Sequence, residues 1–231
     1  MSDFTADQIE GFEGVVKTRR SVRGFTSQLV DEDLMARIFE TARWAPSGTN
    51  VQPWEICVAS GAACQEIRNT FIERVNRGDP IKTDHEPDGK VGSPFKDRKR
   101  DCAKELWGAM GVEWEDRAGR NAAYLRNYDF FDAPHVVFLG MHKIFGAQTA
   151  CDVGMYAQTL MLAMHAHGVA SCPQGTLRNY PDYVRDVFGL APEINILFGI
   201  SFGYEDKSVP ANEARVGRAS VQETAKFINT I

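Results

Sequence analysis

The segment from Ala147 to His167 constrains the fold of this 231-residue chain more than any other part of the sequence. We expect it to form the longest helix, and from Val153 through Met164 that helix is apolar on nearly every side. A helix that is hydrophobic all round belongs at the centre of a domain or in a large interface. Its apolar stretch is about half as long as a membrane span requires, so the sequence predicts a protein environment for this helix.

Helical and strand patterns alternate along the remainder of the chain. Apolar residues spaced three and four apart indicate helices, and short alternating or continuously apolar runs indicate strands. No internal repeat and no Pro/Ser linker separates these elements, so we expect a single α+β domain over residues 1–231. The expected helices cover residues 7–18, about 31–42, 62–76, 97–110, 114–128 and 180–188, and the expected strands cover 54–58, 135–141, 169–172 and 194–202.

Composition and charge argue against several classes of protein. A formal net charge of −5 disfavours a nucleic acid or an anionic membrane as the main partner. The N-terminal residues include acids and no apolar run, so no signal peptide is expected. Five cysteines without any C-x-x-C spacing indicate reduced thiols in a cytoplasmic protein, with neither a disulfide frame nor a metal site.

Residues 45–54, A-P-S-G-T-N-V-Q-P-W, separate an expected helix from an expected strand. Pro46 and Gly48 break the helix. Between the prolines, amide and hydroxyl side chains offer donors and acceptors that complement the polar edge of a pyrimidine-type ring. An ordinary helix-to-strand turn uses the same residue types, so the loop by itself leaves both interpretations open. The polar side chains concerned are those of Ser47, Thr49, Asn50 and Gln52.

Two basic clusters lie near opposite ends of the chain. The first consists of Arg19, Arg20, Ser21 and Arg23, and the second of Arg215 and Arg218. Guanidinium groups and a hydroxyl can give a phosphate monoester charge-assisted, often bidentate hydrogen bonds. A solvated basic turn explains either cluster equally well when it is considered alone.

Other chemistries find no support in the sequence. No G-x-G-x-x-G follows a strand and no G-x-x-x-x-G-K-[ST] occurs, so neither a dinucleotide-binding domain nor a P-loop is indicated. G-x-S-x-G is also absent, and no cysteine lies in a recognisable nucleophile context. The five histidines lack metal-ligand spacing, and we interpret them as structural or exposed.

Residues 77–96 form a long irregular segment that is rich in glycine and proline. Segments of this length are often lids over a site, or disordered. Together with the polar helices after it, the segment would make a lid-like helical excursion at about 77–131. Trp107, Trp114 and Phe130 in this region are more often core residues than substrate contacts, but their position leaves a role facing a substrate open.

Five motifs, in this order and approximate spacing, resemble the FMN-dependent nitroreductase family over nearly the whole chain. They are R-R-S-V-R-G-F at 19–25, A-P-S-G-T-N-V-Q-P-W at 45–54, D-V-G-M-Y-A-Q-T-L-M-L-A at 152–163, C-P-Q-G at 172–175 and N-E-A-R-V-G-R at 212–218. The region 95–131 is similar to the branch that includes bacterial nitrobenzoate and nitroaromatic reductases.

The resemblance implies a nitroreductase-like fold, with a central mixed β-sheet flanked by helices, in an intertwined homodimer. It also implies an oxidoreductase with non-covalent FMN that takes hydride from NAD(P)H, with NADPH favoured, and reduces nitroaromatic or quinone-like acceptors in ping-pong order. The chemistry would belong to the flavin N5 atom, so no catalytic side chain is assigned. Two alternatives stay open: another reaction on this fold, such as reductive dehalogenation or flavin breakdown, and flavin binding without catalysis.

The resemblance further implies where the flavin contacts lie. Arg19 and Ser21, with Arg218 or Arg215, would hold the phosphate, Arg20 would lie along the ribityl chain, and Arg23 would lie beside N1 and O2. Pro46, Ser47, Gly48 and Asn50, in the same loop as Gln52, would reach the flavin from the other subunit. The turn of Pro173, Gln174 and Gly175 would pass over the N5 and O4 side of the ring, where its residues other than proline would offer backbone N–H groups. Many relatives have glutamate at the position of Gln174, a change that a backbone contact survives. Trp107, Trp114 and Phe130 would shape the acceptor side.

Overall fold

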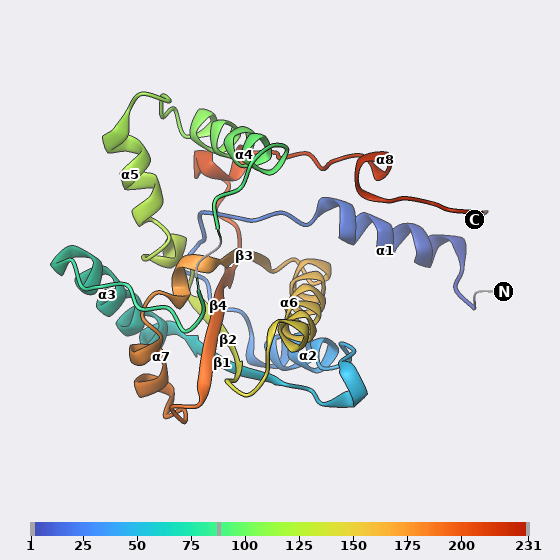
Figure 1. The fold of residues 1–231 in the computed structure, drawn as a ribbon, viewed down its shortest axis with the longest axis horizontal. Helices are drawn as coiled ribbons and strands as arrows, with labels where there is room; N and C mark the ends of the chain where they lie inside the picture. The colour runs from blue at the N-terminus through green and yellow to red at the C-terminus, as the bar shows by residue number, and fades with distance from the viewer. Residues whose placement is uncertain (1–2, 87–88, 230–231) are drawn as a thin grey trace.

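The computed structural model of the chain describes residues 3–86 and 89–229 (Figure 1). Residues 1–2, 87–88 and 230–231, which fall within the expected domain and in part within the expected excursion, lie outside the described residues. Helices and one sheet make up the described part, so the expected α+β class is confirmed. The strands of the sheet lie in the order β1-β2-β4-β3 and are β1 (Trp54–Ser60), β2 (His135–His142), β3 (Ala170–Gln174) and β4 (Ile194–Gly203).

The sheet is antiparallel, not mixed. Neighbouring strands pair antiparallel in all three pairings of the described sheet, so the expected mixed sheet is a wrong prediction for these strands. Parallel pairing is limited, within the described ranges, to one bridge between Ser21 and Ser171. The backbone N–H of Val22 donates to the carbonyl of Ser171 at 3.1 Å, and further along the segment Phe25 forms an antiparallel bridge with Glu205.

β2 lies between β1 and β4 and is covered on both faces, as its continuous apolar run predicts. Side chains alternate between the two faces along a strand. Val136 and Phe138 accordingly belong to one hydrophobic core, whereas Val137 and Leu139 belong to the other. The sheet therefore separates two cores, each closed by helices.

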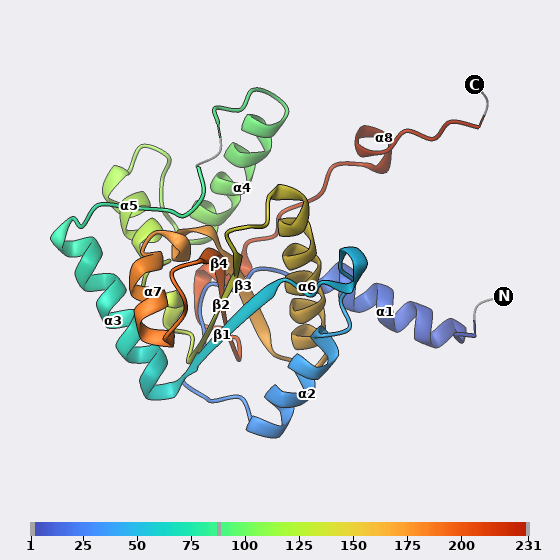
Figure 2. The same ribbon diagram turned by 60° about the horizontal axis from the view of Figure 1, so that its bottom comes forward.

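One pair of helices covers each face of the sheet (Figure 2). Phe71 of α3 (Gly61–Arg77) and Val184 of α7 (Pro181–Phe188) pack into the core that contains Phe138. Ile38 of α2 (Glu32–Ala42) and Leu160 of α6 (Ala147–Ala166) pack into the core that contains Leu139.

α6 is buried on one side and open on another. The buried residues of this helix between Val153 and Met164, such as Val153, Leu160 and Met164, pack into a core with residues of the sheet. Cys151, Met155 and Gln158, spaced three and four apart, are exposed on another face, and Met155 is 39% exposed. Burial on every side is therefore not achieved within one copy of the chain. No helix in the described part of the chain is long and apolar enough to cross a membrane.

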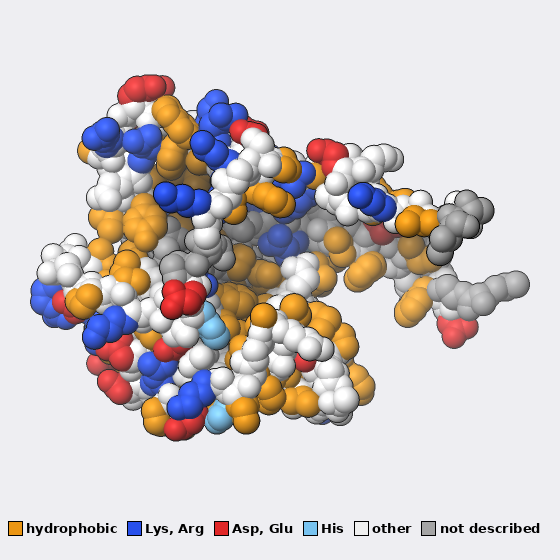
Figure 3. All heavy atoms as spheres, in the orientation of Figure 1, with side chains coloured by type: hydrophobic (Ala, Val, Ile, Leu, Met, Phe, Trp, Pro, Cys, Tyr) orange, Lys and Arg blue, Asp and Glu red, His pale blue; other side chains and the backbone are white. Residues whose placement is uncertain are grey.

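Two segments extend away from the body on the same side (Figures 1 and 3). One is α1 (Ala6–Thr18), whose start is fixed by a capping box between Thr5 and Gln8. The other is the C-terminal segment with α8 (Val221–Thr224). None of the residues of α1 is buried, although its sequence is amphipathic. Its apolar stripe of Ile9, Phe12 and Val16 thus faces solvent in the single chain.

The expected excursion contains two helices that stand apart from the layers (Figure 1). They are α4 (Phe95–Ala109) and α5 (Arg117–Leu125), and Ala123 alone is buried among their residues. The backbone N–H of Arg215 donates to Glu105 of α4 at 3.1 Å, which joins the excursion to the C-terminal segment. The described residues also include the 3₁₀ helices η1 (Gly48–Asn50), η2 (Phe130–Asp132), η3 (Gly175–Arg178) and η4 (Pro210–Glu213).

Candidate functional site

Asn212 brings the two ends of the chain together. The residue is 1% exposed, and its Oδ1 atom accepts from the backbone N–H of Arg23 at 2.6 Å. Its Nδ2 atom donates to the carbonyls of Gly24 at 2.9 Å and Asp206 at 2.8 Å. Gly24 suits this crossing because a Cβ there would lie 2.5 Å from the side chain of Val209. The sequence contained no signal for this role, since Asn212 bonds to backbone 189 positions away.

A cavity of about 140 Å³, here called the Arg19 cavity, lies beside the first basic cluster. Arg19, Arg20, His165, Ser171 and Glu205 contribute its polar lining. Arg20 forms an ion pair with Glu205 through Nη2, but its Nη1 and that of Arg19 are buried without a hydrogen-bond partner. Buried donors without an acceptor are costly. An anion such as a phosphate would satisfy both.

Electrostatics distinguish the two C-terminal arginines. Burial, and next the charge of Arg218, lower the pKa of Arg19, which requires the two guanidinium groups to be near each other. Both arginines donate to nearby backbone carbonyls, Arg215 to Asn212 and Ala214 and Arg218 to Val216 and Gly217, but only Arg218 is among the charges that lower the pKa of Arg19. The structure therefore brings Arg218, rather than Arg215, into electrostatic contact with Arg19.

His165, which we interpreted as structural or exposed, lines the Arg19 cavity. Its Nε2 atom lies 2.8 Å from the hydroxyl of Thr18, and that hydroxyl donates to the carbonyl of Gly14 at 2.7 Å. Because the hydroxyl has one proton, it accepts from a protonated Nε2 of His165. Burial, and next the charges of Arg19 and Arg20, lower the pKa of His165. The ring is thus a neutral neighbour of the basic cluster.

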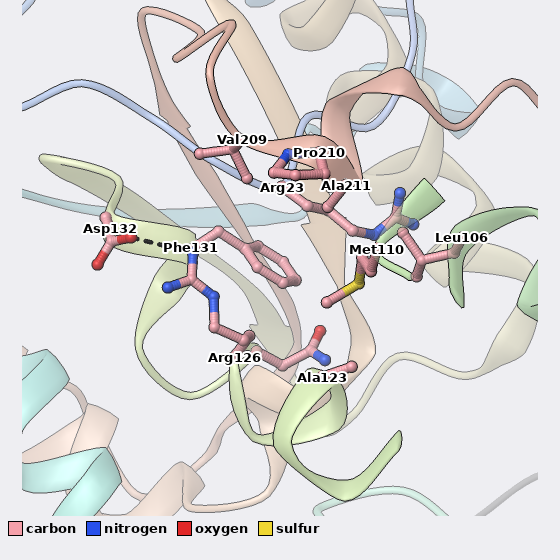
Figure 4. A pocket seen from close by; sticks show the side chains of 11 residues that line it. Arg23, Leu106, Met110, Ala123, Arg126, Phe131, Asp132, Val209, Pro210 and Ala211 are labelled. Carbon is pink, nitrogen blue, oxygen red and sulfur yellow. Dashed lines mark ion pairs between the residues drawn. The ribbon is translucent and has the colours of Figure 1, made fainter. Parts of the chain in front are cut away.

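A larger cavity of about 250 Å³, the Arg23 cavity, lies between the excursion and the C-terminal segment (Figure 4). Its polar side chains are those of Arg23, Arg126, Asn127 and Asp132. Arg126 pairs with Asp132 at 3.0 Å, whereas Nη1 of Arg23 has a weaker contact of 3.4 Å with the carbonyl of Ser21. The apolar walls come from Leu106, Met110, Ala123, Phe131, Val209, Pro210 and Ala211. Such walls with a few placed polar groups suit an aromatic ligand.

Phe130 does not face this cavity, which corrects its expected place on the acceptor side. Its side chain is fully buried between Phe71 and Phe138 in a hydrophobic core. Phe131 lines the cavity instead. Phe130, Phe131 and Asp132 have φ angles of 57°, 54° and 64°. This left-handed turn directs consecutive side chains in a way that no helical or strand pattern predicts.

The loop at 46–52 is exposed and contacts α6. The backbone N–H of Gly48 donates to Asp152 at 3.1 Å, and that of Gln52 donates to the hydroxyl of Ser47 at 2.9 Å. Thr49, Asn50 and Gln52 have positive φ angles of 48°, 59° and 51°. Left-handed backbone outside glycine is costly and concentrates at functional sites. The hydrogen bonds of the loop run to itself and to α6, and not to the arginines of its own chain.

The Nitroreductase family model matches residues 16–204. The chain belongs to the nitroreductase family. Nitroreductase NfnB of Mycolicibacterium smegmatis is 38% identical to it over 231 positions, covering 96% of this chain and 95% of the relative. A 4-nitrobenzoate reductase of Pseudomonas putida is 29% identical over 221 positions, covering 95% of this chain and 96% of the relative.

Solved structures of nitroreductases have the same fold. The crystal structure of the FMN-dependent nitroreductase NfnB from Mycobacterium smegmatis in complex with NADPH gives a TM-score of 0.91 at 36% identity, covering 96% of this chain and 99% of that one. The crystal structure of the FMN and NADPH-dependent NfnB from Sphigopyxis sp. strain HMH gives a TM-score of 0.90 at 33% identity, covering 95% of this chain and 99% of that one. The expected family, its nitroaromatic-reducing branch and the nitroreductase-like fold are confirmed.

In this nitroreductase, Trp107 and Trp114 line a third cavity of about 210 Å³, separate from the Arg23 cavity. Their ring centroids are 5.2 Å apart, and the guanidinium of Arg120 lies over both rings, at 5.3 and 5.7 Å. The side chains of this region at the Arg23 cavity are those of Leu106 in α4 and Met110, the residue that caps α4, which lie four residues apart. The sequence did not indicate either residue as part of a site, because aliphatic side chains at helical spacing occur on any amphipathic helix.

The turn at Pro173, Gln174 and Gly175 ends the edge strand β3. Pro173 and Gly175 are exposed, so the backbone of the turn is accessible there. Gln174 is 3% exposed, and its side chain points into the protein. The backbone contact expected of this turn is therefore compatible with its conformation, whereas the Gln174 side chain has other partners.

Proposed function

We propose that this nitroreductase is an FMN enzyme that takes hydride from NAD(P)H, with NADPH favoured, and reduces nitroaromatic or quinone-like acceptors. The observation that carries the proposal is the pair of buried guanidinium Nη1 atoms, of Arg19 and Arg20, that have no hydrogen-bond partner. A phosphate monoester supplies acceptors of the matching charge. The NfnB structures, described as FMN- and NADPH-dependent, support the same cofactor and reductant.

The residues that would hold FMN form three groups. Arg19, Ser21 and Arg218 would bind the phosphate, and Arg20 would lie beside the ribityl chain. Arg23 would contact the ring at N1 and O2, and the backbone of residues 173–175 would contact N5 and O4. FMN, when bound, supplies the atom that accepts and donates hydride. The protein binds and orients the ring and keeps water from its reacting face.

We further propose that the functional unit is an intertwined cytoplasmic homodimer of one domain per chain. The exposed face of α6 and the uncovered apolar stripe of α1 support an interface. The loop with Pro46, Ser47, Gly48, Asn50 and Gln52, whose hydrogen bonds run to itself and to α6, would contact the flavin of the partner. The excursion at 77–131 would act as a lid over the acceptor.

The Arg23 cavity would receive the acceptor. Its volume and apolar walls suit one aromatic ring, and Arg23 connects it to the flavin-binding segment. Phe131, Leu106 and Met110 would form the wall that selects acceptors. Trp107 and Trp114 would influence this wall indirectly, through the conformation of the excursion.

The absorbance spectrum of purified protein, recorded before and after anaerobic addition of NADPH, tests the proposal. We expect a yellow protein with extractable FMN that bleaches on reduction and recovers with a nitroaromatic compound. Extracted FAD, or no flavin after reconstitution, would contradict the cofactor. Bound FMN that NADPH does not reduce would favour flavin binding without catalysis. Turnover of a halogenated aromatic or of free flavin, but not of nitroaromatics, would favour the other reactions.

Steady-state kinetics should show parallel double-reciprocal lines when NADPH and a nitroaromatic compound are varied together. Both substrates must reach the same flavin face, and the sequence has no dinucleotide-binding motif that would supply a second pocket. They must therefore bind in turn, which is the ping-pong pattern. Intersecting lines, or calorimetric evidence of both ligands on the oxidised enzyme, would contradict this order.

Arg23→Ala should lower the reduction potential of bound FMN by roughly 30–60 mV. A cation beside N1 and O2 stabilises the negative charge of the reduced ring. Losing a charge-assisted contact costs about 1.5–3 kcal/mol, which corresponds to that range for a two-electron couple. Arg23→Lys, which keeps the charge, should shift the potential less. An unchanged potential in Arg23→Ala would show that this side chain does not contact the ring.

Phe131→Leu and Phe130→Leu should differ in their effect on the acceptor. Phe131 lines the cavity, so its variant should raise the KM for the acceptor several-fold, and because Phe131 is itself 3% exposed it should also lose some unfolding free energy. Phe130→Leu should leave this KM near that of the wild type. Phe130 is a core residue, so its variant should lose about 1–3 kcal/mol of unfolding free energy. Denaturant titration and acceptor kinetics measure the two effects. The reverse pattern would return Phe130 to the acceptor side.

A further inference from the structure

The buried side chain of Gln174 forms hydrogen bonds inside the protein at both ends of its amide group. Its Nε2 atom donates to the backbone carbonyl of Asn127 at 2.8 Å and lies 3.3 Å from Asn127 Oδ1. Its Oε1 atom accepts from the hydroxyl of Ser201 on β4. A carbonyl oxygen can only accept, so this environment fixes which end of the amide faces Asn127. Every polar atom of the side chain is thus satisfied by the excursion on one side and the sheet on the other.

Asn127 follows α5 and lines the Arg23 cavity. Its carbonyl also accepts from the backbone N–H of Phe130 at 3.3 Å, at the start of the left-handed turn. The N–H of Phe131 donates to the carbonyl of Arg126 at 3.2 Å. The backbone between Arg126 and Asp132 therefore holds the side chains that form one wall of the cavity.

Other contacts also hold the segment after α5: the hydroxyl of Tyr128 accepts from Asn179 Nδ2 at 2.7 Å, and the carbonyl of Phe131 accepts from the N–H of Phe25 at 3.2 Å. The two helices of the excursion contribute less. Among the described residues of α4 and α5, Ala123 alone is buried. The Gln174 bond originates on β3, in the turn whose backbone is proposed to contact FMN. It therefore joins that turn to the cavity wall through one buried side chain.

We propose that Gln174 is a positioning residue that sets acceptor specificity by fixing the segment 126–132 against the sheet. Its side chain contacts neither acceptor nor flavin; it acts through Asn127 and Phe131. The inference rests on the proposed function, because the wall it positions is the proposed acceptor site. Glutamate at this position has no hydrogen to donate when ionised, so it would turn an attractive contact with the Asn127 carbonyl into a repulsive one.

The test compares Gln174→Glu and Gln174→Ala with Ser201→Ala, which leaves the bond to Asn127 in place. Hydrogen exchange of the apoprotein should accelerate about tenfold at the amides of residues 128–132 in both Gln174 variants, as expected for one lost buried hydrogen bond. In the FMN-loaded protein the acceptor KM should rise by a similar factor, and by more than any change in the rate of flavin reduction by NADPH. Ser201→Ala should show smaller changes in both quantities.

Three outcomes would overturn the proposal. If amide hydrogen exchange at residues 128–132 and the acceptor KM both stay unchanged in the Gln174 variants, the hydrogen bond between Gln174 and Asn127 does not position the cavity wall. A joint loss of FMN affinity, flavin reduction and acceptor turnover would show that the side chain serves the cofactor. Equal effects of Ser201→Ala would show a general loss of packing. If Gln174→Glu does not fold, Gln174→Ala decides. Failure of the wild type to bind FMN would refute the proposed function, and the exchange of the apoprotein would still decide whether Gln174 anchors the segment.

Discussion

Arg19→Ala should weaken FMN binding by roughly 10- to 100-fold and leave riboflavin binding nearly unchanged. A charge-assisted hydrogen bond is worth about 1.5–3 kcal/mol, and each 1.4 kcal/mol is about a factor of ten in affinity. Riboflavin lacks the phosphate and has nothing to lose at this position. The apoprotein of the variant should stay folded, because the Nη1 atom of Arg19 has no partner there to lose. Fluorescence titration of the apoprotein with each flavin measures both affinities.

Arg215→Ala is the matched control for this experiment. The Arg215 guanidinium donates to nearby backbone carbonyls and does not interact electrostatically with Arg19. Its variant should bind FMN within about threefold of the wild type, less than the loss of one charge-assisted bond. Arg218→Ala should behave like Arg19→Ala. An equal loss of riboflavin and FMN affinity in Arg19→Ala would move this residue away from the phosphate.

Phe12→Asp should raise the dissociation constant of the proposed homodimer by at least about 100-fold. Phe12 is 64% exposed on α1, in a stripe that one copy of the chain leaves uncovered. Burying a Phe side chain stabilises an interface by about 1.5–3 kcal/mol, and the twofold axis of a homodimer would apply the loss twice. FMN should dissociate in parallel, because the loop with Asn50 would reach it from the partner. Sedimentation and flavin fluorescence across a dilution series measure both.

Gly11→Asp places the same charge on another side of α1, where a Cβ meets nothing within 4 Å. This control should keep the dimer and its flavin. A monomeric Phe12→Asp protein that binds FMN with full affinity would show that each site is complete within one chain. A dimer that survives Phe12→Asp unchanged would place the interface elsewhere.

Periodicity predicted most elements because it reports which side of a segment is buried. The helix expected at 62–76 is α3 (Gly61–Arg77), and its apolar residues Cys64, Ile67 and Phe71 are buried. Strand direction leaves no such trace, since an apolar alternation reads the same in parallel and antiparallel sheets. The expected mixed sheet was therefore wrong, and the residue pattern contains no information on strand direction that could have corrected it.

Candidate site residues could be predicted where their side-chain chemistry indicates a ligand. They could not be predicted where the backbone conformation determines which side chain faces the site. Clustered guanidinium groups are visible in the chain alone, so Arg19 and Arg218 could be named as candidates for an anion, although a solvated basic turn gives the same pattern. Phe131 could not be separated from Phe130, because consecutive left-handed residues set their directions. Asn212 and Gln174 act through backbone partners that are far away in the sequence.

The bond between Arg23 and Asn212 spans 189 positions and has a consequence for synthesis on the ribosome. The first basic cluster leaves the exit tunnel 189 positions ahead of the residue that fixes its backbone. Contacts of such long sequence separation form slowly in folding. The nascent chain can assemble helices and sheet before this bond exists. If the cluster binds the flavin phosphate as proposed, flavin capture would wait until Asn212 has left the ribosome.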